Sequence, residues 1–412
     1  MSESASEPER LGPDFTRLLA AATASNFGSM LTGIALPLFA IELLHATPGE
    51  IAAMNAAAIA PGIALGLFAA HAIDRVRRRP VLVGADLVRA ALLLALPLAA
   101  FSDALAMVHV VAFAFCRGLF DFAFGVAEQA YLPTVVPPRA LVRANGRLQA
   151  GDSSAEAVGF AAGGWLVQVL SAPLALLIDS ASYLVSAFLI VRIRTVEPPR
   201  APVATAGRRA RWREITAGAR EIAQRPELRA ITAAAMLVSA AQQAVGTVYM
   251  LFVYRELGFA AGPLGMLFAL GAVSSLAAAF AAERVPERLS GLPAMTAGLA
   301  VCALGPFLLA LAPGATLYGV AAIAAQQIVG DGGYVMYEVH QRSLRQRITP
   351  PQVLGRVSGA IRFAASLAML GGTALGGWLG GAIGLRATLV AGGCGTALAA
   401  LAALRVGARS RT

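Results

Sequence analysis

The chain contains no lysine and few charged residues of either sign. Charged residues occupy 14% of its 412 positions, and all 33 Lys or Arg positions are arginine. A soluble domain carries about 25% charged residues. A chain that is 58% hydrophobic and this poor in charge lacks the polar surface that water solubility requires. We therefore expect lipid, not water, to surround most of the protein.

Other absences exclude whole classes of function. The three cysteines, Cys116, Cys302 and Cys394, lie far apart inside apolar runs, which gives neither a disulfide framework nor a metal site. The sequence has no Gly-x-x-x-x-Gly-Lys loop, no His-Glu-x-x-His and no Gly-x-Ser-x-Gly. We expect no enzyme, no catalytic residue, no metal and no cofactor. The net charge of +10 is spread over many loops, so we expect no nucleic-acid partner either.

Long apolar runs are abundant. A membrane-spanning helix needs about 20 apolar residues. Twelve runs are long enough, and they cover Leu18–Leu43, Ile51–Ile73, Val81–Phe101, Leu105–Ala127, Gln149–Leu170, Pro173–Ile193, Ala230–Val253, Pro263–Ala282, Leu292–Ala312, Thr316–Met336, Val357–Ala382 and Leu385–Leu404. The sequence thus predicts an all-α polytopic membrane protein with twelve transmembrane helices.

The arginines predict the orientation of these spans. If the N-terminus is cytoplasmic, only Arg255 and Arg386 fall outside, while Arg89, Arg117 and Arg362 lie within spans and all the others fall inside. Cytoplasmic loops carry an excess of Arg. Because one missed span would reverse every later loop, this asymmetry supports a multi-pass protein of the cell (inner) membrane with both termini in the cytoplasm.

An internal repeat relates the two ends of the chain. At an offset of 213 residues, Gly159 falls on Gly372, and the run 163–166 falls on the identical run 376–379, Gly-Gly-Trp-Leu. Two parallel six-helix halves follow, at 1–194 and 230–412. In the cytoplasmic loop between them, 195–229, apolar residues recur at helical spacing among arginines. This pattern predicts an amphipathic helix on the anionic inner leaflet, with a site for a regulatory partner as the alternative.

The loop at 70–79, after the second span, resembles the pattern Gly-x-x-x-Asp-Arg-x-Gly-Arg-Arg of the major facilitator superfamily. Asp74, Arg75, Arg78 and Arg79 match, and Ala70 and Arg77 replace the two glycines. The resemblance covers nearly the whole chain and is closest to the drug and siderophore exporter branch (enterobactin-exporter-like). It implies that this loop latches the cytoplasmic face closed, since a carboxylate is stabilised by a helix N-terminus and by guanidinium groups. The alternative is that these arginines only fix the topology.

Two further spans carry parts of the family's patterns. Arg117 lies in the fourth span where exporters of this family often place an Arg, and Asp121 follows one turn later. The pair either faces a substrate cavity or neutralises itself and packs helices. Residues 159–164 resemble the antiporter pattern Gly-Pro-x-x-Gly-Gly, with Phe160 in place of Pro. The alternative is plain helix packing by Gly159, Gly163 and Gly164, which Gly372, Gly376 and Gly377 repeat in the other half.

Polar residues inside other spans complete the candidate site. A carboxylate removed from water favours its protonated form, which is the chemistry that proton coupling needs. The candidates for proton coupling are Asp121, Glu156, Asp152, Asp179 and Asp331. An ion pair with a neighbour such as Arg362 is the alternative for Glu156. The candidates for lining a cavity, or for bonding between helices, are Asn26, Gln242, Gln243, Gln326 and Gln327, and Arg117 joins them. We read Asp86 and Arg89 as a structural pair.

These observations favour a monomeric secondary transporter that exports small amphipathic, drug-like molecules by alternating access, with proton antiport. Its expected partners are a small-molecule substrate, protons and the lipid bilayer. A dedicated exporter of a siderophore or another metabolite is the alternative within transport. A non-transporting membrane sensor with the same fold is the alternative outside it.

Overall fold

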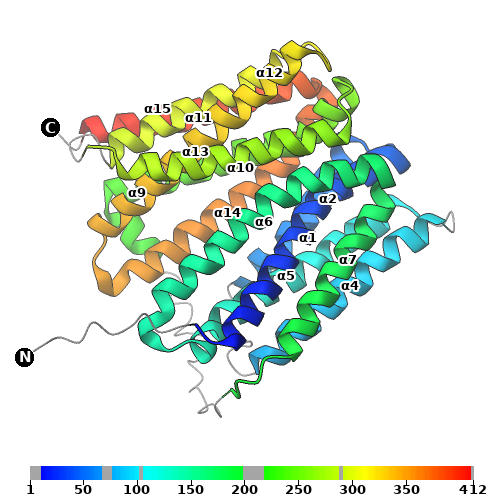
Figure 1. The fold of residues 1–412 in the computed structure, drawn as a ribbon. Helices are drawn as coiled ribbons and strands as arrows, with labels where there is room; N and C mark the ends of the chain where they lie inside the picture. The colour runs from blue at the N-terminus through cyan, green and yellow to red at the C-terminus, as the bar shows by residue number, and fades with distance from the viewer. Residues whose placement is uncertain (1–10, 67–76, 102–104, 198–217, 287–290, 410–412) are drawn as a thin grey trace, which may run out of the picture.

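A computed structural model describes residues 11–66, 77–101, 105–197, 218–286 and 291–409, and all regular structure in these ranges is helical (Figure 1). The first part of the chain forms α1 (Pro13–Leu43), α2 (Pro48–Gly66), α4 (Arg78–Phe101), α5 (Met107–Val135), α6 (Leu141–Leu170) and α7 (Ala172–Val191). The second part forms α9 (Pro226–Met250), α10 (Ala261–Glu283), α11 (Leu292–Ala310), α12 (Leu317–Gln326), α13 (Gly332–Ile348), α14 (Pro351–Ala382) and α15 (Leu385–Arg409). A π-helical turn, η2 (Leu251–Glu256), extends α9, and another, η4 (Gln327–Asp331), joins α12 to α13.

Every predicted span overlaps one of these helical segments, and the end of the second, residues 67–73, lies outside the described residues. Nine helices in the described ranges are long and apolar enough to cross a membrane. The three other predicted spans fall on α2, on α6 and on the continuous segment α12–η4–α13. The predicted all-α membrane fold is therefore confirmed, and the helical segments are consistent with twelve spans.

Hydropathy and helix ends disagree around both repeat-related loops. The predicted fourth span ends at Ala127 but α5 continues to Val135, and the predicted fifth begins at Gln149 but α6 begins at Leu141. The predicted tenth span ends at Met336 but α13 continues to Ile348, and the predicted eleventh begins at Val357 but α14 begins at Pro351. Polar residues can extend a helix beyond the apolar region because its hydrogen bonds are internal. Helix α5 ends where Val136 turns extended, directly before Pro137, a position that disfavours helical backbone.

Glycines at repeat-related positions let helices touch within each half. A Cβ at Gly159 would lie 2.8 Å from Met30, and one at Gly163 would lie 3.1 Å from the Cα of Leu31, so α6 packs directly on α1. Gly372 and Gly376 of α14 meet α9 in the same way, at Ala240 and Ala244. The pairs α1–α6 and α9–α14 are therefore equivalent contacts of the two halves, and only small residues fit there.

The next glycine in each run faces the other half. A Cβ at Gly164 would overlap the carbonyl oxygen of Ala261 and would lie 2.8 Å from the Cα of Gly265, both on α10. A Cβ at Gly377 would overlap Ala52 and would lie 3.0 Å from the carbonyl oxygen of Pro48, both on α2. The halves therefore meet through α6–α10 and α14–α2, and the two contacts are related by the same repeat.

The buried apolar residues show on which side the halves are in contact. On the side that carries the chain termini, one cluster around Phe15, Leu82 and Tyr131 belongs to the first half, and a separate cluster around Leu228, Leu299 and Val357 belongs to the second. On the opposite side a single cluster runs through both halves, from Leu31 and Ile51 to Val248 and Leu264. The halves are thus joined away from the termini and form separate cores beside them.

The predicted gating loop lies partly outside the described residues, which exclude Asp74 and Arg75. Arg78 and Arg79 begin α4, and their backbone N–H groups donate to the Glu197 carboxylate at 2.9 and 2.8 Å. Glu197 therefore caps the N-terminus of α4, where a negative charge is favourable. Of the amphipathic helix predicted over 208–229, residues 218–229 are described. Residues 218–224 are helical, the extended Arg225 separates them from α9, and Ile222 packs against the core of the second half.

Candidate functional site

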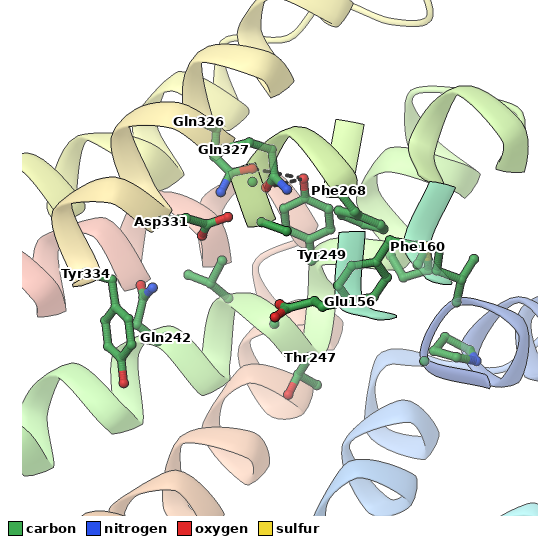
Figure 2. Close-up of a pocket in the computed structure, with 18 of the residues that line it drawn as sticks. Glu156, Phe160, Gln242, Thr247, Tyr249, Phe268, Gln326, Gln327, Asp331 and Tyr334 are labelled. Carbon is green, nitrogen blue, oxygen red and sulfur yellow. Dashed lines mark hydrogen bonds between the residues drawn. The ribbon is translucent and has the colours of Figure 1, made fainter. Parts of the chain in front are cut away.

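A cavity of about 530 Å³ lies between the two halves (Figure 2). This volume is in the range of small-molecule binding sites. From the first half, the cavity is lined by Gly33, Ile34, Pro37, Ile51, Asn55, Glu156 and Phe160. From the second half, it is lined by Gln242, Val245, Gly246, Thr247, Tyr249, Met250, Phe268, Gly271, Ala272, Ser275, Gln326, Gln327, Asp331 and Tyr334. Each half thus contributes side chains, which is the arrangement that alternating access requires.

The charge of the cavity is entirely negative. Glu156 from the first half and Asp331 from the second both point into it (Figure 2). Neither has a hydrogen-bond or ion-pair partner within the described part of the chain, and they lie close enough to repel one another. No described lining residue is Arg or His. The site therefore has two carboxylates available for a proton or a cationic group.

Aromatic rings lie beside these carboxylates. Phe268 of α10 lies with its ring centroid 5.8 Å from that of Phe160 and 5.4 Å from that of Tyr249. The three rings come from α6, α9 and α10, so they bridge the halves. Aromatic faces bind apolar groups and also attract cations, which contributes about 0.5–2 kcal/mol per contact.

Amide groups fix the polar end of the aromatic row. The hydroxyl of Tyr249 donates to Oε1 of Gln326 at 2.9 Å and lies 3.5 Å from Oε1 of Gln327. Gln327 is buried and its Nε2 donates to the carbonyl of Leu267 at 3.3 Å. These hydrogen bonds hold the tyrosine ring in place at the cavity wall (Figure 2).

The π-helical turn η4 positions Asp331. The glycines around Asp331 predict a close or bent helix crossing, and the chain does pass through a π-helical turn there. A Cβ at Gly333 would overlap the backbone of Cys302 at 2.5 Å, and one at Gly330 would lie 3.6 Å from Gly305, so η4 and α13 lie against α11. A π-turn inserts one residue into the helix, which redirects the side chains beyond it and is frequent at functional sites.

A second set of charges lies within the first half and does not line the cavity; Asp86 and Arg89 are buried, whereas the side chain of Asp121 is 38% exposed. Arg89 is 3% exposed, and its guanidinium contacts Asp86 and donates to Asp121 at 2.9 Å. Nε of Arg117 lies 3.3 Å from the other oxygen of Asp121. The guanidinium of Arg89 also lies 4.4 Å from the ring centroid of Phe124 and 4.3 Å from that of Tyr183. The predicted structural pair of Asp86 and Arg89 is present, and Arg89 extends it to Asp121, which joins Arg117 to the same network.

Asp179 closes the same network at α7. It is completely buried, and it accepts hydrogen bonds from the hydroxyl of Thr32 and, at 2.9 Å, from that of Ser182. Its charge is close enough to act on Arg117. Tyr183 continues the network to α1, since its hydroxyl lies 2.9 Å from that of Ser29. Asp121, Asp179 and Arg117 are thus held by partners, unlike Glu156 and Asp331.

The remaining predicted residues are divided between these regions. Gln242, Gln326 and Gln327 line the cavity, whereas Gln243 and Asn26 are not among its lining residues. Asn26 donates instead to Asp152 at 2.7 Å, one turn from Glu156. The proposed partner of Glu156, Arg362, makes no ion pair with it in the described part of the chain and lines a different cavity.

Tyr249, Phe268, Tyr334 and Asn55 line the cavity but were missed from the sequence. Aromatic residues in apolar spans carry no signal that separates a cavity wall from a lipid-facing or packed position.

Comparison with known proteins agrees with this architecture. Residues 18–373 match the family model described as Major Facilitator Superfamily. The chain is 29% identical over 407 residues to the "Uncharacterized MFS-type transporter y4rN" of Sinorhizobium fredii, covering 96% of this chain and 95% of that protein.

Solved structures share the fold at low identity. A bacterial homologue of the iron transporter ferroportin, in an inward-facing state, has a TM-score of 0.78 at 16% identity and covers 97% of this chain and 99% of its own. The nucleoside transporter NupG has a TM-score of 0.73 at 13% identity, covering 96% of this chain and 99% of its own. With the family model matching most of its length, the chain belongs to the Major Facilitator Superfamily of membrane transporters.

Proposed function

We propose that this transporter moves small amphipathic organic cations by alternating access, in exchange for protons. One observation carries the proposal: Glu156 and Asp331, which have no partner in the described part of the chain, lie in a cavity that Phe160, Tyr249 and Phe268 also line. A cationic substrate would be attracted by both carboxylates, and its apolar part would pack on the rings.

The same carboxylates explain the coupling. A proton and a cationic substrate compete for a carboxylate, so each can displace the other as the cavity changes its exposure. Asp121 and Asp179 are less suited to this role because guanidinium groups and hydroxyl donors occupy their oxygens. Asp152 remains a candidate for relaying a proton, since it is one turn from Glu156 and bonds only the neutral amide of Asn26.

The arrangement of the apolar clusters supports alternation. The halves share one core away from the termini and have separate cores beside them. If the termini are cytoplasmic, as the arginines predict, separate cores on that side correspond to a state open to the cytoplasm. The ferroportin homologue with the same fold was solved in an inward-facing state. From the resemblance to the exporter branch, we further expect the protein to export its substrate across the cell (inner) membrane and to act as a monomer.

Two alternative functions would use the same cavity. A dedicated exporter of a siderophore or another metabolite would use the same cavity with a narrower choice of substrate. A non-transporting sensor would bind a ligand in the cavity without moving it. The structures that share this fold include iron, metal and nucleoside transporters, so the fold does not choose among substrates.

Flux through the purified protein in sealed vesicles tests the proposal. We expect a pH gradient to drive accumulation of a cationic dye, and addition of the dye to discharge the gradient. A neutral analogue of the dye and an anionic one of similar size serve as matched substrates, and a siderophore panel tests the first alternative. Dye binding without flux would favour the sensor, and flux that is indifferent to substrate charge would contradict the role of the carboxylates.

A further inference from the structure

A second cavity lies within the second half, towards the side of the termini, and the proposed transport function does not use it. Its volume is about 340 Å³. It is formed between α9, α13 and α14. Tyr334 also lines the central cavity, so the two cavities adjoin at this ring.

The charge of this second cavity is positive, opposite to that of the central one. Three arginines line it against a single carboxylate, Glu338, and that carboxylate is already paired with Arg342 at 2.6 Å. Arg345 and Arg362 have no carboxylate partner within the described ranges, although Arg345 is close enough to both other arginines to be repelled by them. Two positive charges are therefore uncompensated at one wall.

One buried donor group in this cavity is unused. Nε of Arg345 is inaccessible to solvent and makes no hydrogen bond within the described part of the chain. A guanidinium presents its N–H groups in a planar fork that matches a carboxylate or phosphate in two parallel hydrogen bonds. A buried donor without a partner costs free energy that such a ligand would recover.

The remaining wall suits the organic part of a ligand. Tyr334 and Tyr337 lie with ring centroids 6.0 Å apart, and Ala235, Val238 and Ile361 are apolar. Hydroxyl and amide groups of Ser239, Ser358 and Gln341 can bond further oxygens of an anion. The cavity therefore combines two free guanidinium groups, polar donors and an apolar surface.

We propose that this cavity binds an organic anion through its phosphate or carboxylate group, held by Arg345 and Arg362. The shared chemistry could come from the headgroup of an anionic phospholipid or from a soluble metabolite. The site does not depend on the substrate of the central cavity, and the ligand would lie next to that cavity at Tyr334.

Thermal unfolding of the full chain in lipid nanodiscs tests the site. In neutral phosphatidylcholine nanodiscs, we expect inorganic phosphate to raise the Tm by about 2 °C or more relative to chloride at equal ionic strength. Nanodiscs that contain phosphatidylglycerol are measured in parallel. The variants are Arg345→Gln and Arg362→Gln, with Arg356→Gln as the control, since Arg356 is an exposed arginine of the same helix as Arg362 and does not line the cavity.

The outcomes separate the two sources. A rise with phosphate that both variants lose and the control keeps identifies a site for a soluble anion. A rise only with phosphatidylglycerol, lost in the same two variants, identifies a lipid headgroup site. No rise in either condition, or a rise that both variants keep, overturns the proposal. If Arg345→Gln does not fold, Arg362→Gln alone decides, because Arg362 is exposed in the unliganded cavity.

Discussion

The two halves share a fold but place their charges differently. At the offset of 213 residues, the charged positions Asp86, Arg89, Arg117, Asp121 and Asp179 of the first half fall on Leu299, Cys302, Gly330, Tyr334 and Gly392 of the second. Where the first half holds an ion-pair network, the second has uncharged side chains, of which Tyr334 lines the cavity. Within the membrane, the second half instead keeps Asp331 and several amides at the cavity wall.

This difference suggests a division of roles. The charges of this first-half network pair with one another and connect α1, α4, α5 and α7, so they specify how these helices pack. Breaking such a buried pair leaves a charge without compensation and costs about 3–5 kcal/mol. Asp331 of the second half has no partner in the described part of the chain and is free to bind something else. We therefore expect stability to depend on the network, and transport to depend on the cavity.

The largest effect should come from breaking the network. Replacing Arg89 with Leu leaves the buried Asp86 without a guanidinium and leaves Asp121 with Arg117 alone. We expect the free energy of unfolding to fall by about 3–5 kcal/mol. The matched change in the other half is Cys302→Ala, which removes one buried sulfur and should cost only about 1 kcal/mol. Denaturation in detergent measures both. Equal losses in the two halves would remove the contrast.

A smaller effect should come from the contact between the halves. In Gly164→Ala, the added Cβ overlaps the carbonyl of Ala261, so the joined side should be destabilised by about 1–3 kcal/mol. We expect the population to shift towards a state that is open on that side, read as the distance between spin labels on the ends of α6 and α10. Gly381→Ala is the control, since a Cβ there meets nothing within 4 Å. An unchanged distance distribution would contradict this role of the contact.

The aromatic wall should contribute less again. Phe268→Ala removes the ring that joins Phe160 and Tyr249, and we expect the affinity for a cationic dye to fall by roughly 2- to 30-fold, equivalent to about 0.5–2 kcal/mol. Dye fluorescence titration measures it. Phe280→Ala, in the same helix but exposed and not lining the cavity, is the control. The idea fails if both variants lose the same affinity.

The smallest effect should come from Tyr249→Phe. It removes the hydrogen bond to Gln326 but keeps the ring, so we expect a loss in dye affinity of at most about 1 kcal/mol. The same dye titration compares Tyr249→Phe with Tyr249→Ala. If both give the same loss, the hydroxyl rather than the ring carries the contribution of Tyr249.

Much of the fold was predictable, because the length of the apolar runs, the placement of the arginines and the internal repeat can be read directly from the sequence. The helix packing at Gly159 and Gly372 illustrates this, since only a small residue permits that approach and both positions keep it. The carboxylates of the candidate site were predictable, because a charged side chain within a membrane span is energetically costly whichever way it faces. Which of these carboxylates have partners was not predictable, because Arg89 contacts Asp121 from another helix and Asn26 contacts Asp152 at a sequence separation of 126 residues.

The most direct test compares carboxylates of the cavity with a matched carboxylate outside it. Glu156→Gln, Asp331→Asn and Glu283→Gln are reconstituted, and dye accumulation and proton movement are recorded together under a pH gradient; Glu283 is exposed at the end of α10 and does not line the cavity. The account predicts that the two cavity variants unfold like the wild type but lose coupled accumulation at least tenfold, while Glu283→Gln keeps it. Full coupled transport in both cavity variants would contradict the central claim.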